Sequence, residues 1–247
     1  MKNARKRKKQ HLFLRSLILF VLVIAILFGV MVSRVYPASE EAVQVMAAGQ
    51  PVTGAACASG LTVFEPVIST GVGIVFYPGA LVDTKAYAPL MQALADRGLL
   101  CVLADMPLHM AFMDANAACA VPPMFPEISH WYVAGHSLGG TMAGTCVASH
   151  PELFEGAILL ASYTTADLTR SRVLSVYGTN DEVLSTDRYA QYLKYLPSDM
   201  TEVVLMGGCH SYFADYGMQQ GDGTPTISRE NQLTATADAC AAFVKGQ

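Results

Sequence analysis

Ser137 stands in the segment "WYVAGHSLGGTMAG", where an apolar run ends in Gly-His-Ser-Leu-Gly-Gly and small residues follow at helical spacing. A serine that projects from a sharp strand-to-helix turn needs small residues two positions before and after it, because larger side chains would collide there. Gly135 and Gly139 meet that requirement. The segment therefore predicts either a nucleophilic serine held out at a tight turn or an ordinary structural turn.

A serine hydroxyl becomes a useful nucleophile only beside a base, and the base needs an acidic group that orients it. Asp181 follows the apolar segment "RVLSVYG", and His210 follows "TEVVLMGG". Each residue thus comes after a predicted strand, as Ser137 does, and the order along the chain is Ser, Asp, His. Glu182 is the alternative acid, and turn formation in "GTNDE" is the alternative role of Asp181.

The elements that must position these residues alternate between strands and helices. Because binding and catalysis in parallel sheets occur at the carboxyl ends of the strands, this alternation would bring Ser137, Asp181 and His210 to one edge. The pattern predicts an α/β fold with a mostly parallel central sheet and helices on both faces, in which 61–67 and 72–79 are neighbouring strands. The predicted strands are 61–67, 72–79, 99–107, 131–135, 156–162, 172–178 and 201–208, and the predicted helices are 40–48, 84–97, 110–118, 138–149, 186–195 and 228–244.

From about residue 61 to 244, the chain resembles the α/β-hydrolases, and most of all the small, lidless, dienelactone-hydrolase-like group of bacterial proteins. The resemblance is carried by "VFYPGALVDTKAYAPLMQALADRG", "LADMPL", "YVAGHSLGG", "SVYGTNDEVL" and "GGCHSYFADYG". It implies an α/β-hydrolase fold with Ser137 as nucleophile, His210 as general base and acid, and Asp181 as the residue that orients the histidine. Cys209 departs from the pattern, which has asparagine at this position in its nearest members.

The same resemblance implies an oxyanion hole made of two backbone N–H groups. One belongs to Leu138, the residue after the nucleophile. The other comes from the loop after "VFYPG", where we favour Ala80, with Leu81 as the neighbouring alternative. Removing one such donor typically raises the barrier by about 3 kcal/mol.

The sequence leaves no room for a lid domain, because only roughly ten residues separate the strand that ends near Ser162 from the strand that begins near Arg172. We therefore expect a shallow, open site that suits a small or extended ester. The expected walls of this site are Tyr87, Met110, Phe112 and Tyr212.

The N-terminal part carries an apolar segment, "LILFVLVIAILFGVMV", that is long enough to cross a bilayer core of about 30 Å as a helix. Seven basic residues and no acidic residue precede it, so the positive-inside rule places the N-terminus in the cytoplasm and the rest outside. We predict a basic cytoplasmic segment (1–15), a transmembrane signal-anchor (16–35), a juxtamembrane helix and linker (36–60), and an α/β-hydrolase domain (61–247). A cleaved signal peptide, which would give a secreted protein, is the alternative.

Charge and motifs narrow the function further. Eight of the 16 Lys and Arg residues and none of the 20 Asp and Glu residues precede Tyr36, so the remainder has a net charge of −12. A part this acidic is a poor nucleic-acid binder. The sequence has no dinucleotide-binding loop, phosphate-binding loop or zinc motif, so we expect no cofactor and no metal. Export permits disulfides among the six cysteines, although their spacing gives no connectivity.

The leading hypothesis is a membrane-anchored extracytoplasmic serine hydrolase. It would cleave a small-molecule carboxylic ester through a Ser-His-Asp triad and an acyl-serine intermediate, at Ser137, His210 and Asp181. The alternatives are an acyltransferase or a peptidase on the same triad, or a non-catalytic binding module with this fold.

Overall fold

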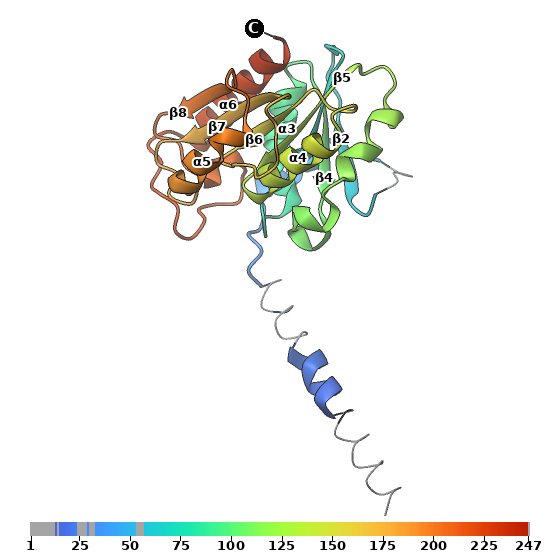
Figure 1. The fold of residues 1–247 in the computed structure, drawn as a ribbon, viewed down its shortest axis with the longest axis vertical. Helices are drawn as coiled ribbons and strands as arrows, with labels where there is room; N and C mark the ends of the chain where they lie inside the picture. Colours follow the sequence, from blue (N-terminus) through green and yellow to red (C-terminus); the bar gives the residue numbers. More distant parts are fainter. Residues whose placement is uncertain (1–12, 14, 24–28, 30–32, 53–56, 247) are drawn as a thin grey trace, which may run out of the picture. The chain divides into compact units, whose positions relative to one another are not determined.

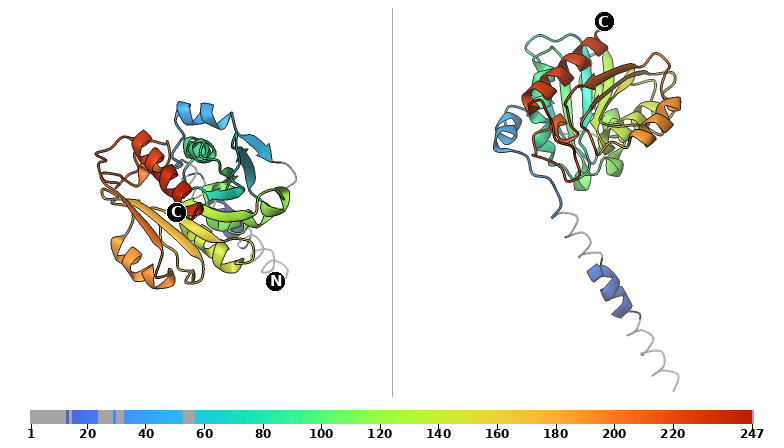
Figure 2. Two further views of the ribbon diagram at one scale, coloured as in Figure 1. Left: turned by 90° about the horizontal axis from the view of Figure 1, so that it is seen from above. Right: turned by 90° about the vertical axis from the view of Figure 1, so that its left-hand side faces the viewer.

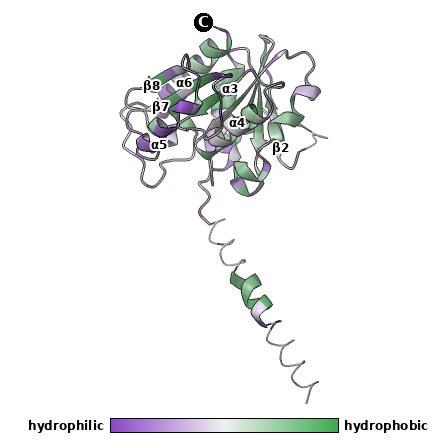
Figure 3. Cartoon of the chain, viewed as in Figure 1, coloured by the Kyte–Doolittle hydropathy of each residue, from purple (hydrophilic) through white to green (hydrophobic). Residues whose placement is uncertain are grey.

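The computed structural model describes residues 13, 15–23, 29, 33–52 and 57–246. The chain divides into two compact units, Met1–Val35 and Tyr36–Gln247. In the first unit, residues 15–23 are helical and mostly apolar (Figure 3). Within the described residues, no helix has both the length and the apolar character needed to span a bilayer. The predicted anchor extends over residues 24–28 and 30–32, which lie outside the described residues.

The second unit is built on one sheet, which has eight strands within the described residues (Figure 1). Their order across the sheet is β1-β2-β4-β3-β5-β6-β7-β8. The six strands from β4 to β8 in this order are parallel to one another, and at one edge β2 runs antiparallel to both of its neighbours, β1 and β4. The predicted α/β class with a mostly parallel sheet is therefore confirmed. The strands are β1 Gln50–Val52, β2 Gly60–Phe64, β3 Val72–Tyr77, β4 Leu100–Asp105, β5 His130–His136, β6 Gly156–Leu160, β7 Arg172–Gly178 and β8 Thr201–Leu205.

The prediction that β2 and β3 are neighbours is wrong. β2 pairs with β4, with Leu61 opposite Ala104 and Phe64 opposite Cys101, and β4 separates it from β3. The cause is the crossover from β3 through a helix to β4, which returns the chain to the strand position next to β3. β2 is then left to pair with the outer edge of β4.

Helices cover both faces of the sheet, with α4 and α5 on one face and α3 and α6 on the other (Figures 1 and 2). β3 shows why the sheet needs both layers, because its side chains alternate between them. Ile74 and Phe76 pack in the core that α3 and α6 cover, whereas Val75 and Tyr77 pack in the core that α4 covers. The helices are α2 Glu40–Met46, α3 Ala88–Ala95, α4 Leu138–Ser149, α5 Thr186–Tyr192 and α6 Arg229–Val244.

The segment that precedes β1 belongs to the same compact unit as the sheet. Ser39 caps α2, since its hydroxyl accepts a hydrogen bond from the N–H of Ala42, and Ala42 is buried. Figure 2 shows α2 beside α3. The helix predicted at 40–48 is therefore present as α2, and it packs against α3.

The predicted helix at 110–118 is wrong, because the chain forms a series of 3-10 turns there instead. Just before this segment, Leu108 and His109 have φ angles of 56° and 54°, in the left-handed region, so no α-helix runs into it from Pro107. The turns are η2 Pro107–His109, η3 Ala111–Asp114, η4 Ala117–Ala120 and η5 Pro122–Met124. The predicted helix at 84–97 begins as a 3-10 turn, η1 Thr84–Tyr87, and continues as α3.

Candidate active site

Ser137 lies at the turn between β5 and α4, with φ 53° and ψ −122°. A non-glycine residue in such a conformation is strained, and the surrounding structure must hold it. The two glycines predicted to permit the turn are needed: a Cβ on Gly139 would lie 2.1 Å from the carbonyl oxygen of Tyr77, and one on Gly135 would lie 2.3 Å from the carbonyl carbon of Gly139. The tight turn that the sequence predicted is therefore present.

Asp181 and His210 are brought together at the same edge of the sheet, after β7 and β8. Nδ1 of His210 lies 2.9 Å from Oδ2 of Asp181, and both side chains are 1% exposed. The other oxygen of Asp181 accepts the N–H groups of Val183 (2.9 Å) and Leu184 (2.8 Å). Because an ionised carboxylate can only accept, Nδ1 of His210 is the donor in this contact, and in a neutral imidazole Nε2 is then the acceptor. Glu182, the alternative acid, is exposed.

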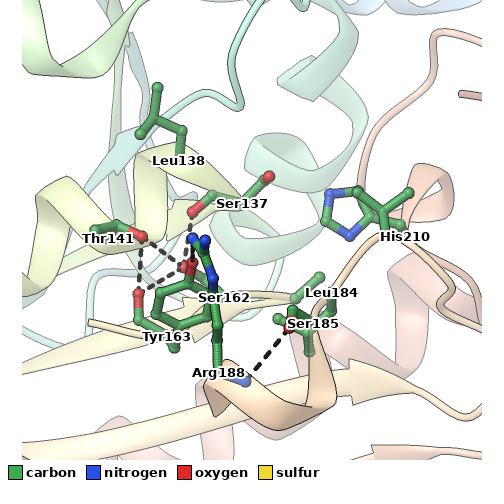
Figure 4. A pocket seen from close by; sticks show the side chains of 11 residues that line it. Ser137, Leu138, Thr141, Ser162, Tyr163, Leu184, Ser185, Arg188 and His210 are labelled. Carbon is green, nitrogen blue, oxygen red and sulfur yellow. Dashed lines mark hydrogen bonds between the residues drawn. The ribbon is translucent and has the colours of Figure 1, made fainter. Parts of the chain in front are cut away.

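Nε2 of His210 is buried and has no hydrogen-bond partner among the described residues. His210 and Ser137 line the same pocket. Figure 4 shows the side chain of Ser137 directed to the side on which His210 lies. The structure therefore places a histidine with an unused lone pair in one pocket with the strained serine.

The loop after β8 holds His210 through its backbone. Asp222 accepts the N–H groups of His210 (3.1 Å) and Ser211 (2.7 Å). Gln232 of α6 accepts the N–H of Cys209 (3.0 Å) and donates to its carbonyl (2.7 Å). Burial, reinforced by the nearby Asp222 carboxylate, raises the pKa of the Cys209 thiol to about 12, so this residue is a neutral packing group beside His210. All six cysteines of the chain are free thiols.

A second histidine lies beneath the first. The rings of His136 and His210 are 4.5 Å apart, and Nδ1 of His136 lies 2.8 Å from the hydroxyl of Tyr87. That hydroxyl also accepts the N–H of Gly79 at 2.8 Å. Burial is the main cause that lowers the pKa of His136 well below its ordinary value, so the ring is neutral. Tyr87 was predicted to form a wall of the site; this is wrong, because it is fully buried beneath it.

The two predicted oxyanion donors have N–H groups without partners among the described residues. The N–H of Leu138 opens α4, and the first N–H groups of a helix have no partner within the helix. In the loop after β3, Gly79 donates to Tyr87 and Leu81 donates to the carbonyl of His109 (3.0 Å), whereas Ala80 makes no hydrogen bond through its N–H to any described residue. Of the two alternatives that the sequence left open, Ala80 thus has the free donor.

The pocket beside Ser137 has a volume of about 320 Å³ and is lined by polar and apolar groups in similar measure. Met110, Phe112 and Tyr212, which the sequence predicted as walls, do not line it. Ser137, Leu138 and His210 were predicted as site residues, but nothing in the sequence pattern marks most of the other lining residues, because they come from the loop after β6 and from α5 and its approach (Figure 4). The lining residues are Ser137, Leu138, Thr141, Ala161, Ser162, Tyr163, Val183, Leu184, Ser185, Arg188 and His210.

The segment from β6 to β7, residues 161–171, contains no inserted helical domain, in agreement with the predicted absence of a lid. Within the part of the chain that the structure describes, no group of three or more His, Cys, Asp or Glu side chains is arranged to hold a metal ion.

Residues 73–234 match the alpha/beta hydrolase family, and this match covers most of the chain. The chain therefore belongs to the alpha/beta hydrolase family.

Individual relatives are distant. Over 112 residues the chain is 30% identical to the "Putative non-heme haloperoxidase" of Mycobacterium phage D29. The aligned part makes up 42% of this chain and 40% of that protein. The chain thus spans about two fifths of the length of this curated relative.

Among solved structures, Est1E from Butyrivibrio proteoclasticus is 14% identical with a TM-score of 0.58, over 80% of this chain and 99% of Est1E. Est1E with ferulic acid bound gives a TM-score of 0.54, with 14% identity over 76% of this chain and 96% of that one. The butyrate-bound esterase Est2 from Thermogutta terrifontis is 12% identical with a TM-score of 0.57, over 82% and 97% of the two chains. At these identities the likeness shows the shared fold alone.

Proposed function

We propose that this chain is a serine hydrolase that cleaves carboxylic esters through an acyl-serine intermediate. Oγ of Ser137 attacks the ester carbonyl carbon while its proton passes to Nε2 of His210. The N–H groups of Leu138 and Ala80 receive the negative charge that develops on the carbonyl oxygen. The imidazolium, oriented by Asp181, then returns the proton to the leaving alcohol. A water molecule then attacks the acyl-serine in the same way, with His210 accepting its proton and returning it to Oγ of Ser137, and the carboxylic acid is released.

The observation that carries this proposal is the buried, unpartnered Nε2 of His210 in the pocket of Ser137. A buried polar atom without a hydrogen bond lowers the stability of the fold, and a role in catalysis or binding is one reason for such an atom to be present. Accepting the proton of an attacking hydroxyl gives this nitrogen its partner. The strained backbone of Ser137 supports the same reading, because such strain collects at functional sites.

An ester is the favoured substrate class. The pocket is small and open, which suits a small acyl group. Two of the similar folds are an esterase with butyrate bound and a protein with ferulic acid bound, and both ligands are carboxylic acids of modest size. Ligands of this kind in proteins of the same fold support a carboxylic ester as the substrate class proposed for this chain.

The proposed location is the cell membrane. Residues 16–35 would serve as an uncleaved signal-anchor that leaves the catalytic unit outside the cytoplasm, and the basic residues before it support this orientation. The N-terminal mass of the protein recovered from membranes tests this part. A mature chain that starts after residue 35 would refute the anchor.

The first experiment is labelling of the detergent-solubilised full chain with a fluorophosphonate probe, beside Ser137→Ala, His210→Ala and the exposed-serine control Ser149→Ala. We expect labelling of the wild type and of Ser149→Ala and none of the other two variants. An ester panel and a comparison of water, alcohol and amine acceptors then separate esterase, acyltransferase and peptidase activity. A folded wild type that takes no label would favour a binding module instead.

A further inference from the structure

One wall of the catalytic pocket carries an unpaired positive charge. Arg188 of α5 lines the pocket together with Ser137 and His210, and no aspartate or glutamate is among the lining residues. Asp181, the acid of the proposed triad, is buried and already engaged by His210 and by two backbone N–H groups. The pocket is therefore locally positive, although the chain beyond residue 35 has a net charge of −12.

Aromatic neighbours hold the Arg188 side chain in this wall. Its Nη1 donates a hydrogen bond to the hydroxyl of Tyr163 at 3.2 Å. Tyr163 is itself stacked on Tyr192, with ring centroids 5.1 Å apart and planes 14° from parallel. Figure 4 shows the Arg188 side chain extending along the pocket from α5, the hydrophilic helix in Figure 3. The guanidinium thus has a defined place instead of extending freely into solvent.

Arg188 has no ionic partner among the described residues. The arginines that do form ion pairs there are Arg97, with Asp238, and Arg229, with Asp215. A guanidinium carries five N–H donors in a planar fork that matches a carboxylate in a bidentate arrangement. One of these donors is used by Tyr163, so the fork retains free donors on a wall of the pocket.

We propose that Arg188 is a specificity residue that binds a carboxylate of the substrate, so that the preferred esters carry a negative charge a few bonds from the scissile carbonyl. Monoesters of dicarboxylic acids place this charge on the acyl side, and esters of hydroxy acids place it on the alcohol side. The proposal rests on the proposed ester hydrolysis and names the substrate class for the same site.

The test compares esters that differ in one charge. For the acyl side, the pair is 4-nitrophenyl butyrate and 4-nitrophenyl hydrogen glutarate; for the alcohol side, it is 4-acetoxybenzoate and its methyl ester. Each pair is assayed with the wild type, Arg188→Gln and Arg188→Lys. Arg170→Gln is the matched control, because Arg170 is also an exposed arginine but does not line the pocket.

We expect Arg188→Gln to lower kcat/KM for the anionic member of one pair about tenfold, mainly through KM, and to leave the neutral member within about twofold. Arg188→Lys should recover part of the loss, because it keeps the charge without the planar fork. Added salt at about 0.5 M should weaken the preference for the anionic ester in the wild type. Arg170→Gln should behave as the wild type. Equal changes for both members of each pair, or none, would overturn the proposal.

A binding measurement separates this proposal from the proposed function. Calorimetric titration of Ser137→Ala and of the Ser137→Ala/Arg188→Gln double variant with 4-nitrophenyl hydrogen glutarate needs no turnover. About tenfold weaker binding by the double variant supports the anionic subsite even if the wild type hydrolyses no ester. Hydrolysis of neutral esters with equal binding by both variants would support the proposed function and refute the subsite.

Discussion

The short segment before α2 connects the loop after β3 to the loop after β8, and the effect of breaking this connection is our most specific structural prediction. Tyr36 donates its N–H to the carbonyl of Leu81 (2.7 Å), next to the proposed oxyanion donor Ala80. Ser39 donates its N–H to the carbonyl of Asp215 (2.9 Å) and its hydroxyl to the Asp215 carboxylate. Asp215 lies five residues after His210, so residues 36–39 join both sides of the site.

The perturbation is Ser39→Ala. It removes the N-cap of α2, whose loss typically costs about 1 kcal/mol of folding free energy. It also removes a hydrogen bond to a carboxylate that is only 5% exposed, and such bonds contribute about 1.5–3 kcal/mol. Arg229 still pairs with Asp215, which keeps the charge compensated. We therefore expect the free energy of unfolding to fall by about 3 kcal/mol.

The activity should change in a way that a mere loss of stability does not produce. Freed from Ser39, the loop after His210 samples positions in which the imidazole is misplaced, and a displacement of about 1 Å can cost about a hundredfold in rate. Because the loop keeps its bonds to Asp222 and Arg229, we expect a smaller fall in kcat, about tenfold, with KM within about twofold.

The assay measures kcat and KM on a neutral ester below the thermal midpoint, together with unfolding in urea. Ser228→Ala is the matched control, because Ser228 caps α6 through the N–H of Asn231 but makes no bond to Asp215. Ser39→Thr keeps the hydroxyl and should restore most of both losses. A Ser39→Ala variant that loses no more stability than Ser228→Ala and keeps its kcat would refute the reasoning.

Three further predictions follow from single contacts. Gly139→Ala puts a Cβ 2.1 Å from the carbonyl oxygen of Tyr77, so it should destabilise the fold by about 3 kcal/mol and abolish fluorophosphonate labelling. Gly60→Ala is the control and should do neither, because the nearest atom to its Cβ lies at 3.5 Å. His136 stays neutral in the folded state while the unfolded chain binds a proton below pH 6.5. Stability should therefore fall with decreasing pH, by about 1.4 kcal/mol at pH 5.5, and His136→Gln should remove this part of the dependence in urea titrations at pH 7.5 and 5.5. The raised pKa of Cys209, about 12, predicts that iodoacetamide at pH 8 leaves it unmodified in the folded chain and alkylates it only after unfolding, as mass spectrometry of its peptide would show.

The parts of the site that could be predicted are those that local rules decide. The turn at Ser137 needs glycine at two fixed positions, and Asp181 and His210 each follow an apolar run that can only be a strand in an alternating pattern. Parallel strands then carry the three residues to one edge without any knowledge of the order of the strands. The structure brings Asp181 against His210 and places His210 in the pocket of Ser137 for this reason.

The pocket walls could not be predicted, since they depend on how elements pack and not on their own pattern. Arg188 looks like any exposed helical arginine, and only the approach of α5 to the loop after β6 puts it in the same pocket as Ser137. Tyr87 shows the converse, because an aromatic residue near a strand end was expected at the surface and is buried under His136. The position of β2 beside β4 likewise follows from a crossover that no local pattern shows.

The turn just before the segment that was wrongly predicted as a helix explains why Leu81, the alternative oxyanion donor, is not free. Leu108 and His109 both adopt left-handed conformations, each at an energetic cost for a residue with a Cβ. This conformation aims the carbonyl of His109 at the N–H of Leu81, which it accepts at 3.0 Å. With Gly79 and Leu81 both engaged, Ala80 is left with the unused N–H of this loop among the described residues. The strained turn at Leu108 and His109 therefore decides between the two alternative donors, because it supplies the carbonyl that engages Leu81 and not Ala80.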